Sequence, residues 1–318
     1  MSLVVVALGG NALVRRGQSP DVSVQRANVK VAAEAVAAVA RDHRVVVTHG
    51  NGPQVGLLAL QNEAYREVRG YPLDVLDAES AGMVGYLLEQ ELGRHLARDR
   101  LATLLTQVVV DADDPAFDHP TKPVGPVVGE AEARRMAADR HWKVAPDGRG
   151  WRRVVPSPEP RCIVELATIR ILVDYGVTVI CTGGGGIPVV DAHGVLIGVE
   201  AVIDKDLAAA LLATELGADA LLLLTDVEGV YDGWGTDDPR LVREATPATL
   251  RRSALPAGSM GPKAEAAARF VEAGGHLAAI GSLKAATALL EGTAGTVVRA
   301  HRTFGPVQAT ADGVGWHQ

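Results

Sequence analysis

Cysteine is almost absent from the sequence: its 318 residues include two, Cys162 and Cys181, and neither has a CxxC partner. Two such residues cannot form the disulfide framework of a small secreted protein, so we expect a protein of the reducing cytoplasm. No apolar run reaches the roughly 18 residues that a membrane-spanning helix needs. The start, Met1 to Val6, has neither a basic segment nor a small-residue cleavage site, so we expect no signal peptide and no membrane association.

Basic residues are in the minority, with 31 Lys+Arg against 38 Asp+Glu and a formal charge of −7. A nucleic-acid-binding surface needs a basic footprint, so this class of partner is not expected. With 47% hydrophobic and 22% charged residues, the composition is typical of a folded globular protein and excludes general disorder. The length is enough for one large α/β domain or two smaller ones.

Lysine is scarce, since it supplies six of the 31 basic residues and arginine the other 25. A chain that uses arginine for routine surface charge can keep lysine for positions where a compact ammonium group has a chemical role. Three lysines are interpreted as ordinary surface charges: Lys30, Lys143 and Lys284. That leaves Lys122, Lys205 and Lys263 as candidates for a functional site.

Short apolar runs, most of them followed by Gly, alternate with longer stretches of helical periodicity. The predicted strands are 3–8, 44–49, 177–182, 220–225 and 276–280, and the predicted helices are about 24–41, 79–98, 163–175, 204–217 and 260–273. Strands that are apolar on both faces belong to a buried parallel sheet. The sequence therefore predicts an α/β fold, a three-layer α/β/α sandwich with an open, mainly parallel sheet. Residues 111–160 break the rhythm with Pro, Gly, Trp and charge, which predicts a small inserted subdomain or lid.

Several common catalytic motifs are missing: there is no GxxxxGK[ST] loop, GxSxG elbow, HExxH motif or zinc-spaced Cys/His cluster. Glycine-rich turns follow the predicted strands instead, the longest being Gly183 to Gly186. A tight strand end explains any single turn of this kind. Several of them, at the sheet edge where α/β proteins bind ligands, favour a site for more than one phosphate or carboxylate.

Two of the candidate lysines lie at predicted helix starts, where a cation is unfavourable. Lys205 is flanked by Asp204, a residue type that caps helices, and by Asp206, whose charge suits the helix dipole. Lys263 repeats the pattern at another helix start. The two predict a cationic pocket, whereas Lys122, in the insert, fits a surface turn or the site.

Phosphoryl transfer needs such a pocket, because the protein stabilises its transition state mainly through position and countercharge. An acceptor that is already an anion needs no general base, in keeping with the lack of an obvious His/Asp pair. His49, at a strand end beside Gly50, fits a general base or a packed histidine.

Six motifs together resemble the carbamate kinases of the amino acid kinase family. They are ALGGNAL (7–13), THGNGPQVG (48–56), GGGGIP (183–188), IDKD (203–206), TDVEGVY (225–231) and GSMGPK (258–263). The string at 48–56, the IDKD element and the insert strings TKPVGP and RRVVPSP resemble carbamate kinases in particular. The resemblance runs from about residue 3 to about residue 298.

The resemblance implies a homodimer, with an eight-stranded sheet over whose carboxyl edge ATP or ADP meets carbamate or carbamoyl phosphate. Within a single domain, about 1–200 would form the acid-substrate and phosphate side and about 201–298 the nucleotide side. Mg²⁺ would accompany the nucleotide without a side-chain cage. The implied catalytic residues are Lys205, Lys263, Asp206 and Lys122; the residues holding the phosphate and carbamate are Gly9, Gly10, Asn11, Gly50, Asn51, Gly52, Gly183, Gly184 and Gly185; those at the nucleotide are Thr225, Asp226, Val227, Tyr231, Met260 and Lys263.

Two features depart from the wider family. Ala7 stands where related acyl-phosphate-forming kinases carry Lys, and carbamate kinases supply Lys205 instead; the segment 299–318 matches no pattern of the family. We expect an ATP:carbamate phosphotransferase that runs toward ATP in arginine and carbamoyl phosphate catabolism. A kinase for another small carboxylate or phosphonate, and a catalytically silent nucleotide or metabolite sensor, are the alternatives.

Overall fold

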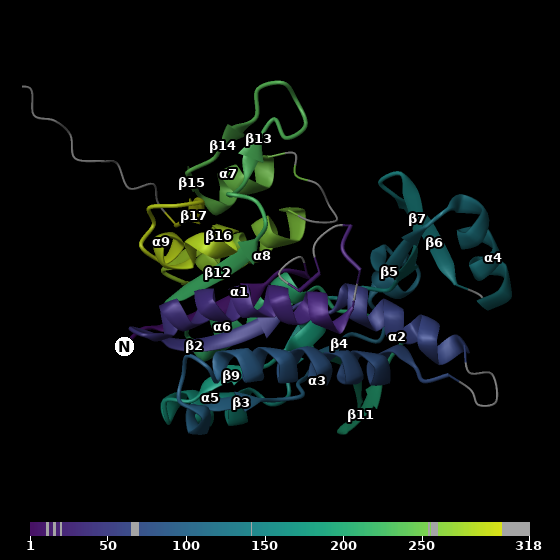
Figure 1. The fold of residues 1–318 in the computed structure, drawn as a ribbon, viewed down its shortest axis with the longest axis horizontal. Helices are drawn as coiled ribbons and strands as arrows, with labels where there is room; N and C mark the ends of the chain where they lie inside the picture. Colours follow the sequence, from purple (N-terminus) through teal and green to yellow (C-terminus); the bar gives the residue numbers. More distant parts are fainter. Residues whose placement is uncertain are drawn as a thin grey trace, which may run out of the picture.

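A computed structural model describes residues 1–10, 13–14, 17–19, 21–64, 70–140, 142–253, 255 and 260–300. Its centre is an eight-stranded sheet of order β15-β17-β16-β12-β1-β2-β9-β3 (Figure 1). Neighbouring strands are parallel except β16 and β17, so the predicted open, mainly parallel sheet is confirmed. The strands are β15 (Glu244–Ala245), β17 (Thr296–Val298), β16 (Leu277–Ser282), β12 (Ala220–Thr225), β1 (Leu3–Leu8), β2 (Arg44–His49), β9 (Thr178–Ile180) and β3 (Leu101–Thr103).

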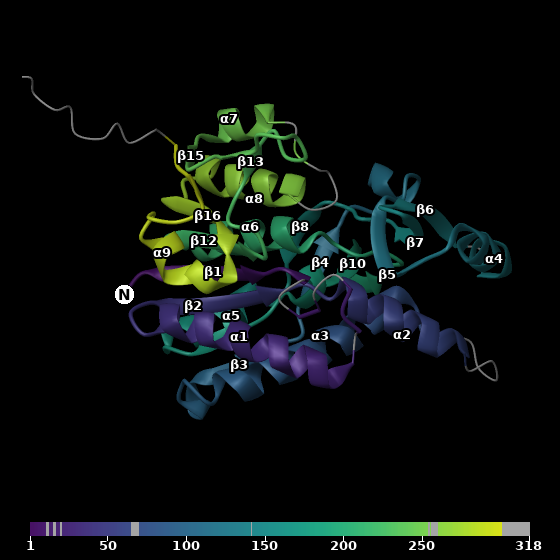
Figure 2. The same cartoon turned by 45° about the horizontal axis from the view of Figure 1, so that its top comes forward.

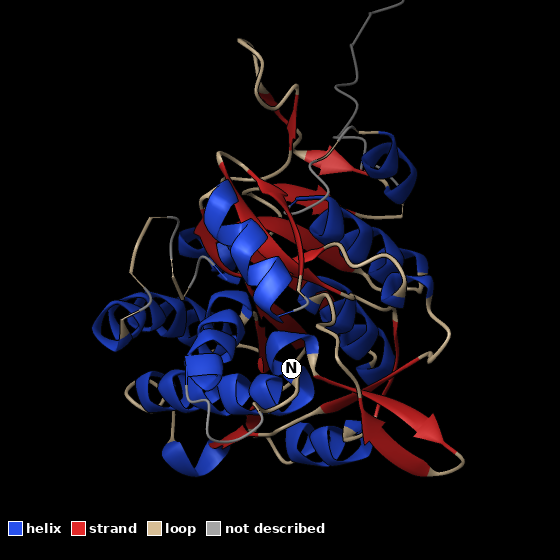
Figure 3. Ribbon diagram, turned by 90° about the vertical axis from the view of Figure 1, so that its right-hand side faces the viewer, coloured by secondary structure: helices blue, strands red, loops and turns tan. Residues whose placement is uncertain are grey.

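Helices cover both faces of this sheet, as Figures 2 and 3 show. One face is covered by α1 (Val22–Ala40), α3 (Leu73–Leu92) and α9 (Ala286–Leu290); the other by α5 (Leu166–Asp174), α6 (Lys205–Leu216) and α8 (Met260–Glu272), with α7 (Pro247–Arg252) beside α8. Along β1, Val4 and Val6 pack into the first layer, and Val5 and Ala7 pack into the second. Burial on both faces explains why the strands are unbroken apolar runs.

Two helices differ from the sequence prediction. The helix expected at about 79–98 begins at Leu73 and ends at Leu92, where Gly93 follows. Its first turns contain the buried Asp77, so they lack the apolar periodicity that marks a helix in sequence. The helix α2 (Gly52–Ala64) was not predicted, because Gly52 and Pro53 indicate a loop, although Pro is well tolerated in a first turn.

A second sheet and a small unit extend the molecule at one side. The second sheet has the order β11 (Val195–Gly198), β10 (Ile187–Ala192), β4 (Gln107–Val110) and β8 (Pro160–Ile163). Within the stretch 111–160, β5 (Lys122–Val128), α4 (Glu130–Arg140), β6 (Lys143–Asp147) and β7 (Gly150–Val155) form a three-stranded antiparallel sheet with one helix. This unit, called the insert below, projects beside α2 on the right of Figure 1.

The remaining regular elements are short. They are β13 (Tyr231–Asp232) paired with β14 (Arg240–Leu241), and the 3₁₀ turns Arg98–Arg100, Pro115–Phe117, Gly183–Gly185 and Leu283–Ala285. Among the described residues, none of the helices combines the length and apolar character needed to cross a membrane.

Candidate active site

The glycine turns after β1 and β2 meet at the carboxyl edge of the central sheet. Gly9 N donates to Leu224 O of β12 at 3.1 Å, and Gly50 N donates to Leu8 O at 3.1 Å. A Cβ placed on Gly50 would lie 3.2 Å from Cδ of Lys205 and 3.3 Å from the Gly10 nitrogen. The Gly50 turn therefore lies directly against the Lys205 side chain and the Gly10 backbone, and glycine at position 50 eases this close approach. Asn11 lies outside the described residues.

Lys205 and Lys263 share one carboxylate. Lys205 Nζ donates to Asp206 Oδ1, and Lys263 Nζ donates to Asp206 Oδ2 at 3.1 Å. The side chains are nearly buried, at 10%, 11% and 5% exposed for Lys205, Lys263 and Asp206. The cationic pocket expected from two helix starts is thus present as a geometric unit that joins α6 to α8.

Asp204 caps α6 and also contacts the insert. Its Oδ1 accepts from the backbone N of Asp206 at 2.9 Å and of Leu207 at 3.3 Å, as the sequence indicated. Its Oδ2 accepts from Lys122 Nζ, at the start of β5. Lys122 therefore lies over the start of α6, beside the lysine pair. We refer to Lys122, Asp204, Lys205, Asp206 and Lys263 as the lysine cluster.

The nearly buried members of the cluster are balanced in charge, and its surplus cation is the partly exposed Lys122. Burial raises the pKa of Asp206, but the neighbouring ammonium groups outweigh that effect and hold the pKa below its usual range, so this carboxylate is ionised. Burial also opposes charging of Lys263, yet Asp206 raises its pKa on balance. Burial lowers the pKa of Lys205. With Lys122 and Asp204 included, three lysines meet two aspartates, and the sum of +1 suits an anionic ligand.

The run of glycines after β9 is required by close packing. Gly184 and Gly185 have positive φ angles of 73° and 103°, which L side chains rarely adopt. A Cβ on Gly184 would lie 2.6 Å from Cγ of Asn51, and one on Gly185 would lie 2.6 Å from Ile203 O. The glycine turn therefore packs closely between Asn51 and Ile203, the residue before Asp204 of the lysine cluster.

Two residues of α3, Asp77 and Ser80, form hydrogen bonds with the Asn51 side chain, and neither was identified from the sequence. Asn51 Nδ2 donates to Asp77 Oδ1 and to Ser80 Oγ, both at 2.8 Å. Burial raises the pKa of Asp77 well above its ordinary value. The only sequence signal was their spacing, because residues three apart share a helix face. Gly52, the next residue of the loop, begins α2 and is half-buried.

His49 is a packed residue beneath the glycine run. It is 1% exposed, and a Cβ on Gly183 would lie 2.7 Å from its Cε1. Burial lowers its pKa to about 4, so the ring is neutral near pH 7. Its Nδ1 lies 3.2 Å from Gly50 O. Of the two interpretations left open, the structure favours the packed histidine.

The residues expected at the nucleotide lie beyond β12, on the far side of the cluster. Thr225 ends β12, and its Oγ1 donates to Asp226 Oδ1 at 3.2 Å. Val227 is half-buried, and Tyr231 begins β13, where its ring lies 5.5 Å from that of Trp234. Met260 is the first residue of α8, three before Lys263. These residues thus come from the segment after β12 and from the start of α8.

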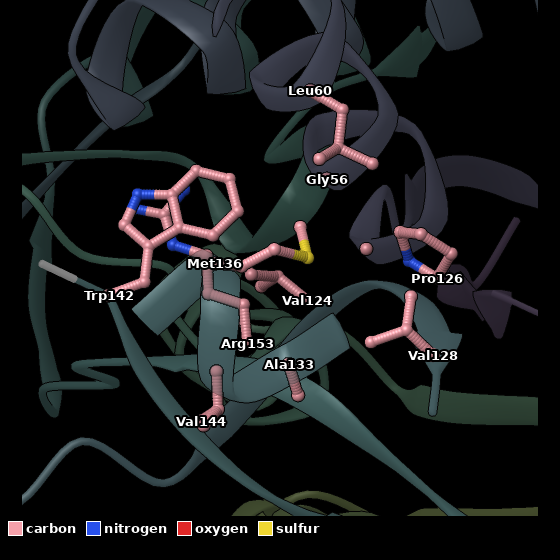
Figure 4. A pocket seen from close by; sticks show the side chains of 11 residues that line it. Gly56, Leu60, Val124, Pro126, Val128, Ala133, Met136, Trp142, Val144 and Arg153 are labelled. Carbon is pink, nitrogen blue, oxygen red and sulfur yellow. The ribbon is translucent and has the colours of Figure 1, made fainter. Parts of the chain in front are cut away.

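The structure shows no metal site among the described residues, and its apolar pocket lies away from the lysine cluster. Among the described residues, no group of three or more His, Cys, Asp or Glu side chains is placed to hold a metal ion. An apolar pocket instead lies between α2 and the insert (Figure 4). Its lining includes Leu60, Val124, Met136, Trp142 and Arg153. No member of the lysine cluster lines it, so the pocket belongs to the joint of the insert.

Comparison with known proteins gives consistent matches. The amino acid kinase family matches residues 2–282. A carbamate kinase of Rhizobium meliloti is 54% identical over 299 residues, covering 93% of this chain and 92% of that protein. The structure of carbamate kinase from Giardia lamblia bound to citric acid has a TM-score of 0.88 and 42% identity, covering 94% of this chain and 98% of the other. The same enzyme bound to AMP-PNP has a TM-score of 0.85, with the same identity and coverage.

Proposed function

The chain belongs to the amino acid kinase family, in its carbamate kinase branch, and from this premise we propose that it transfers the γ-phosphoryl group of ATP reversibly to carbamate. The products are ADP and carbamoyl phosphate. In cells the reaction runs toward ATP, within arginine and carbamoyl phosphate catabolism, in the cytoplasm where both nucleotides are found. The observation that carries the proposal is the pair Lys205 and Lys263 on one buried carboxylate, directly against the Gly10 and Gly50 turns.

Each part of the site has a task in this reaction. The N–H groups of Gly10 and Gly52, beyond those of Gly9 and Gly50 that are bonded within the sheet, orient the phosphoryl group and carbamate. Lys205 and Lys263 stabilise the charge of the transition state. Asp206 keeps the two ammonium groups charged and in place. A carbamate oxygen attacks the phosphorus as the bond to ADP breaks, and no proton has to be removed because carbamate is already an anion. The neutral His49 is not needed as a base.

Mg²⁺ would arrive with the nucleotide phosphates and would neutralise part of their charge. The residues present fit such a metal, because both cluster carboxylates are already engaged by lysines and the pocket supplies cations to the phosphates. The nucleotide itself contacts Thr225 to Val227, Tyr231 and Met260, beside Lys263.

The insert acts as a lid. The contact between Lys122 and Asp204 places its first strand at the cluster, and closure adds a third positive charge over carbamoyl phosphate while excluding water. The glycine pair Gly56 and Gly125 brings α2 and β5 into backbone contact, which joins the insert closely to α2. We also propose a homodimer, supported by the edge position of β3 and the exposed Tyr86 on the adjacent α3.

A coupled assay tests the proposal. Purified protein with ADP, Mg²⁺ and carbamoyl phosphate is expected to form ATP, and omission of Mg²⁺ is expected to stop it. Light scattering on the same sample measures the oligomeric state. Absence of ATP formation under these conditions, in a folded sample, would contradict the proposed activity.

A further inference from the structure

The Asn51 amide is fixed in one orientation by a hydrogen-bond argument. Ser80 Oγ donates its single hydrogen to the backbone carbonyl of Asp77, 3.0 Å away, so toward Asn51 this oxygen can only accept. The Asn51 atom 2.8 Å from Ser80 Oγ must therefore be Nδ2. The second hydrogen of Nδ2 goes to Asp77 Oδ1. Turning the amide over would place Oδ1 against Ser80 Oγ, whose hydrogen is already donated to the Asp77 carbonyl.

The carbonyl oxygen of Asn51 is consequently directed away from α3. Since the amide is planar, Oδ1 lies on the opposite side of Cγ from Nδ2. Asn51 is 2% exposed, and a Cβ on Gly184 would lie 2.7 Å from Oδ1 and 2.3 Å from Nδ2, so the amide packs against the glycine turn. No hydrogen bond to Oδ1 is formed within the described part of the chain. An acceptor of a nearly buried residue thus remains available beside the glycine turn and one residue from Gly50, which contacts Lys205.

The proposed substrate carries the matching donor. Carbamate and carbamoyl phosphate have an amino group, whereas acetate and acetyl phosphate have a methyl group of similar size at the same place. We propose that Asn51 Oδ1 accepts a hydrogen bond from the substrate amino group, and that Ser80 and Asp77 are positioning residues that direct this oxygen to it. This inference rests on the proposed function and names the feature of the site that selects carbamate among small carboxylates.

The energetic consequence is selectivity. A methyl group would leave the buried Oδ1 without a partner, and sites built to hydrogen-bond a substrate strongly reject analogues that lack the group. We therefore expect wild-type protein to use carbamoyl phosphate more than about tenfold better than acetyl phosphate in kcat/KM, with ADP as acceptor.

The decisive variant is Ser80→Ala, measured with both phosphate donors. Loss of the hydroxyl frees the Asn51 amide to turn, so kcat/KM for carbamoyl phosphate should fall roughly tenfold while that for acetyl phosphate stays within a few-fold. The matched control is Thr106→Ala, which also removes a buried hydroxyl. Thr106 Oγ1 accepts from Thr182 N at 3.0 Å and has no contact with Asn51. This control should change both donors equally.

A second pair of variants separates the acceptor from the charge of Asp77. Asp77→Asn keeps an oxygen for Asn51 Nδ2 and should preserve the wild-type donor ratio, whereas Asp77→Leu should lower the ratio as Ser80→Ala does. An unchanged ratio in folded Ser80→Ala or Asp77→Leu would overturn the inference. If neither variant folds, the wild type decides, since a donor ratio near one also overturns it. Wild-type protein that makes no ATP from carbamoyl phosphate would instead refute the proposed function.

Discussion

Two networks of charged side chains in this protein differ in composition and in burial. The lysine cluster has aspartates as its anions, and the side chains of Asp204, Lys205, Asp206 and Lys263 are 5–11% exposed. The second network, called the arginine network, consists of Glu159, Arg251, Glu265, Arg269 and Glu272, with side chains 32–47% exposed. Arg251 donates to both Glu265 and Glu272, at 2.7–3.2 Å.

The two networks differ in the sign of their net charge and in their access to water. The arginine network has two cations against three carboxylates, and water accommodates the imbalance. In the lysine cluster, the nearly buried Lys205 and Lys263 are matched by Asp204 and Asp206, and the surplus cation is Lys122, whose side chain is 28% exposed, so the cluster as a whole favours an anionic ligand. It also contains three of the six lysines of the chain. The scarcity of lysine was therefore informative, because the three lysines singled out from the sequence lie together in one cluster while Lys30, Lys143 and Lys284 are exposed.

Asp206→Asn should have the largest effect, because it leaves two buried lysines without their shared carboxylate. Removing one partner of a buried pair costs about 3–5 kcal/mol, and turnover should fall because both lysines lose their position. The folded-state pKa of Asp206 is depressed, so its stabilisation is present above the unfolded pKa of about 3.9 and is lost as the pH falls further. Urea unfolding at pH 7 and pH 3 measures this, and the difference from wild type should shrink at the lower pH. Glu265→Gln is the matched control in the arginine network.

Lys205→Ala should reduce kcat by about 10²–10³ while the protein stays folded. The loss is one of transition-state countercharge, and Asp206 keeps Lys263 as a partner. The coupled assay measures turnover, and circular dichroism shows whether the variant is folded. A variant with turnover within a few-fold of wild type would show that Lys205 is not catalytic.

His49 should produce a stability loss at mildly acidic pH that the arginine network does not produce. Its pKa is 6.5 in an unfolded chain and about 4 when buried, so stability is complete above pH 6.5 and falls as the pH drops toward 4. The difference between these two pKa values corresponds to about 3 kcal/mol of unfolding free energy. His49→Gln should flatten this pH dependence of the unfolding free energy, whereas replacing the exposed His276 by Gln should not. Equal slopes in all three proteins would argue against a buried neutral ring.

Lys122→Ala tests the exposed end of the lysine cluster. The Lys122 side chain is 28% exposed, and the insert positions its ammonium group beside the proposed substrate site. We expect kcat/KM for carbamoyl phosphate to fall roughly ten- to hundredfold, the value of a charge-assisted hydrogen bond, with little change in ADP binding. Calorimetry measures the ADP affinity. If Lys122→Ala weakened the use of carbamoyl phosphate and the binding of ADP equally, or weakened neither, Lys122 would be an ordinary surface residue.

Arg251→Ala should have the smallest effect. Exposed ion pairs contribute about 0–1 kcal/mol, so the unfolding free energy should change within that range and kcat should not change. A loss of activity here comparable to that of Lys205→Ala would remove the distinction between the two networks.

The sequence was informative wherever neighbouring residues carry the signal. The strands 3–8, 44–49 and 220–225 have the predicted bounds, because burial on both faces makes most of their side chains apolar. The Asp204 cap and the unusual placement of Lys205 were also visible, since both follow from the start of one helix. Where a buried polar residue interrupts the pattern, as Asp77 does in α3, the helix was predicted but its start was placed six residues too late.

By itself, then, the sequence determined the layers of the fold, the glycine turns at the sheet edge and the kind of chemistry, because these depend on local periodicity and residue type. Tertiary structure alone decided which charges meet: Lys263 is 57 positions from Asp206, and Lys122 is 82 positions from Asp204. It alone decided the direction of the Asn51 carbonyl, since that depends on two side chains of α3, 26 and 29 positions away. Hydrogen bonds and ion pairs of this kind form through space between elements that the sheet brings together, and no local pattern in the chain records them.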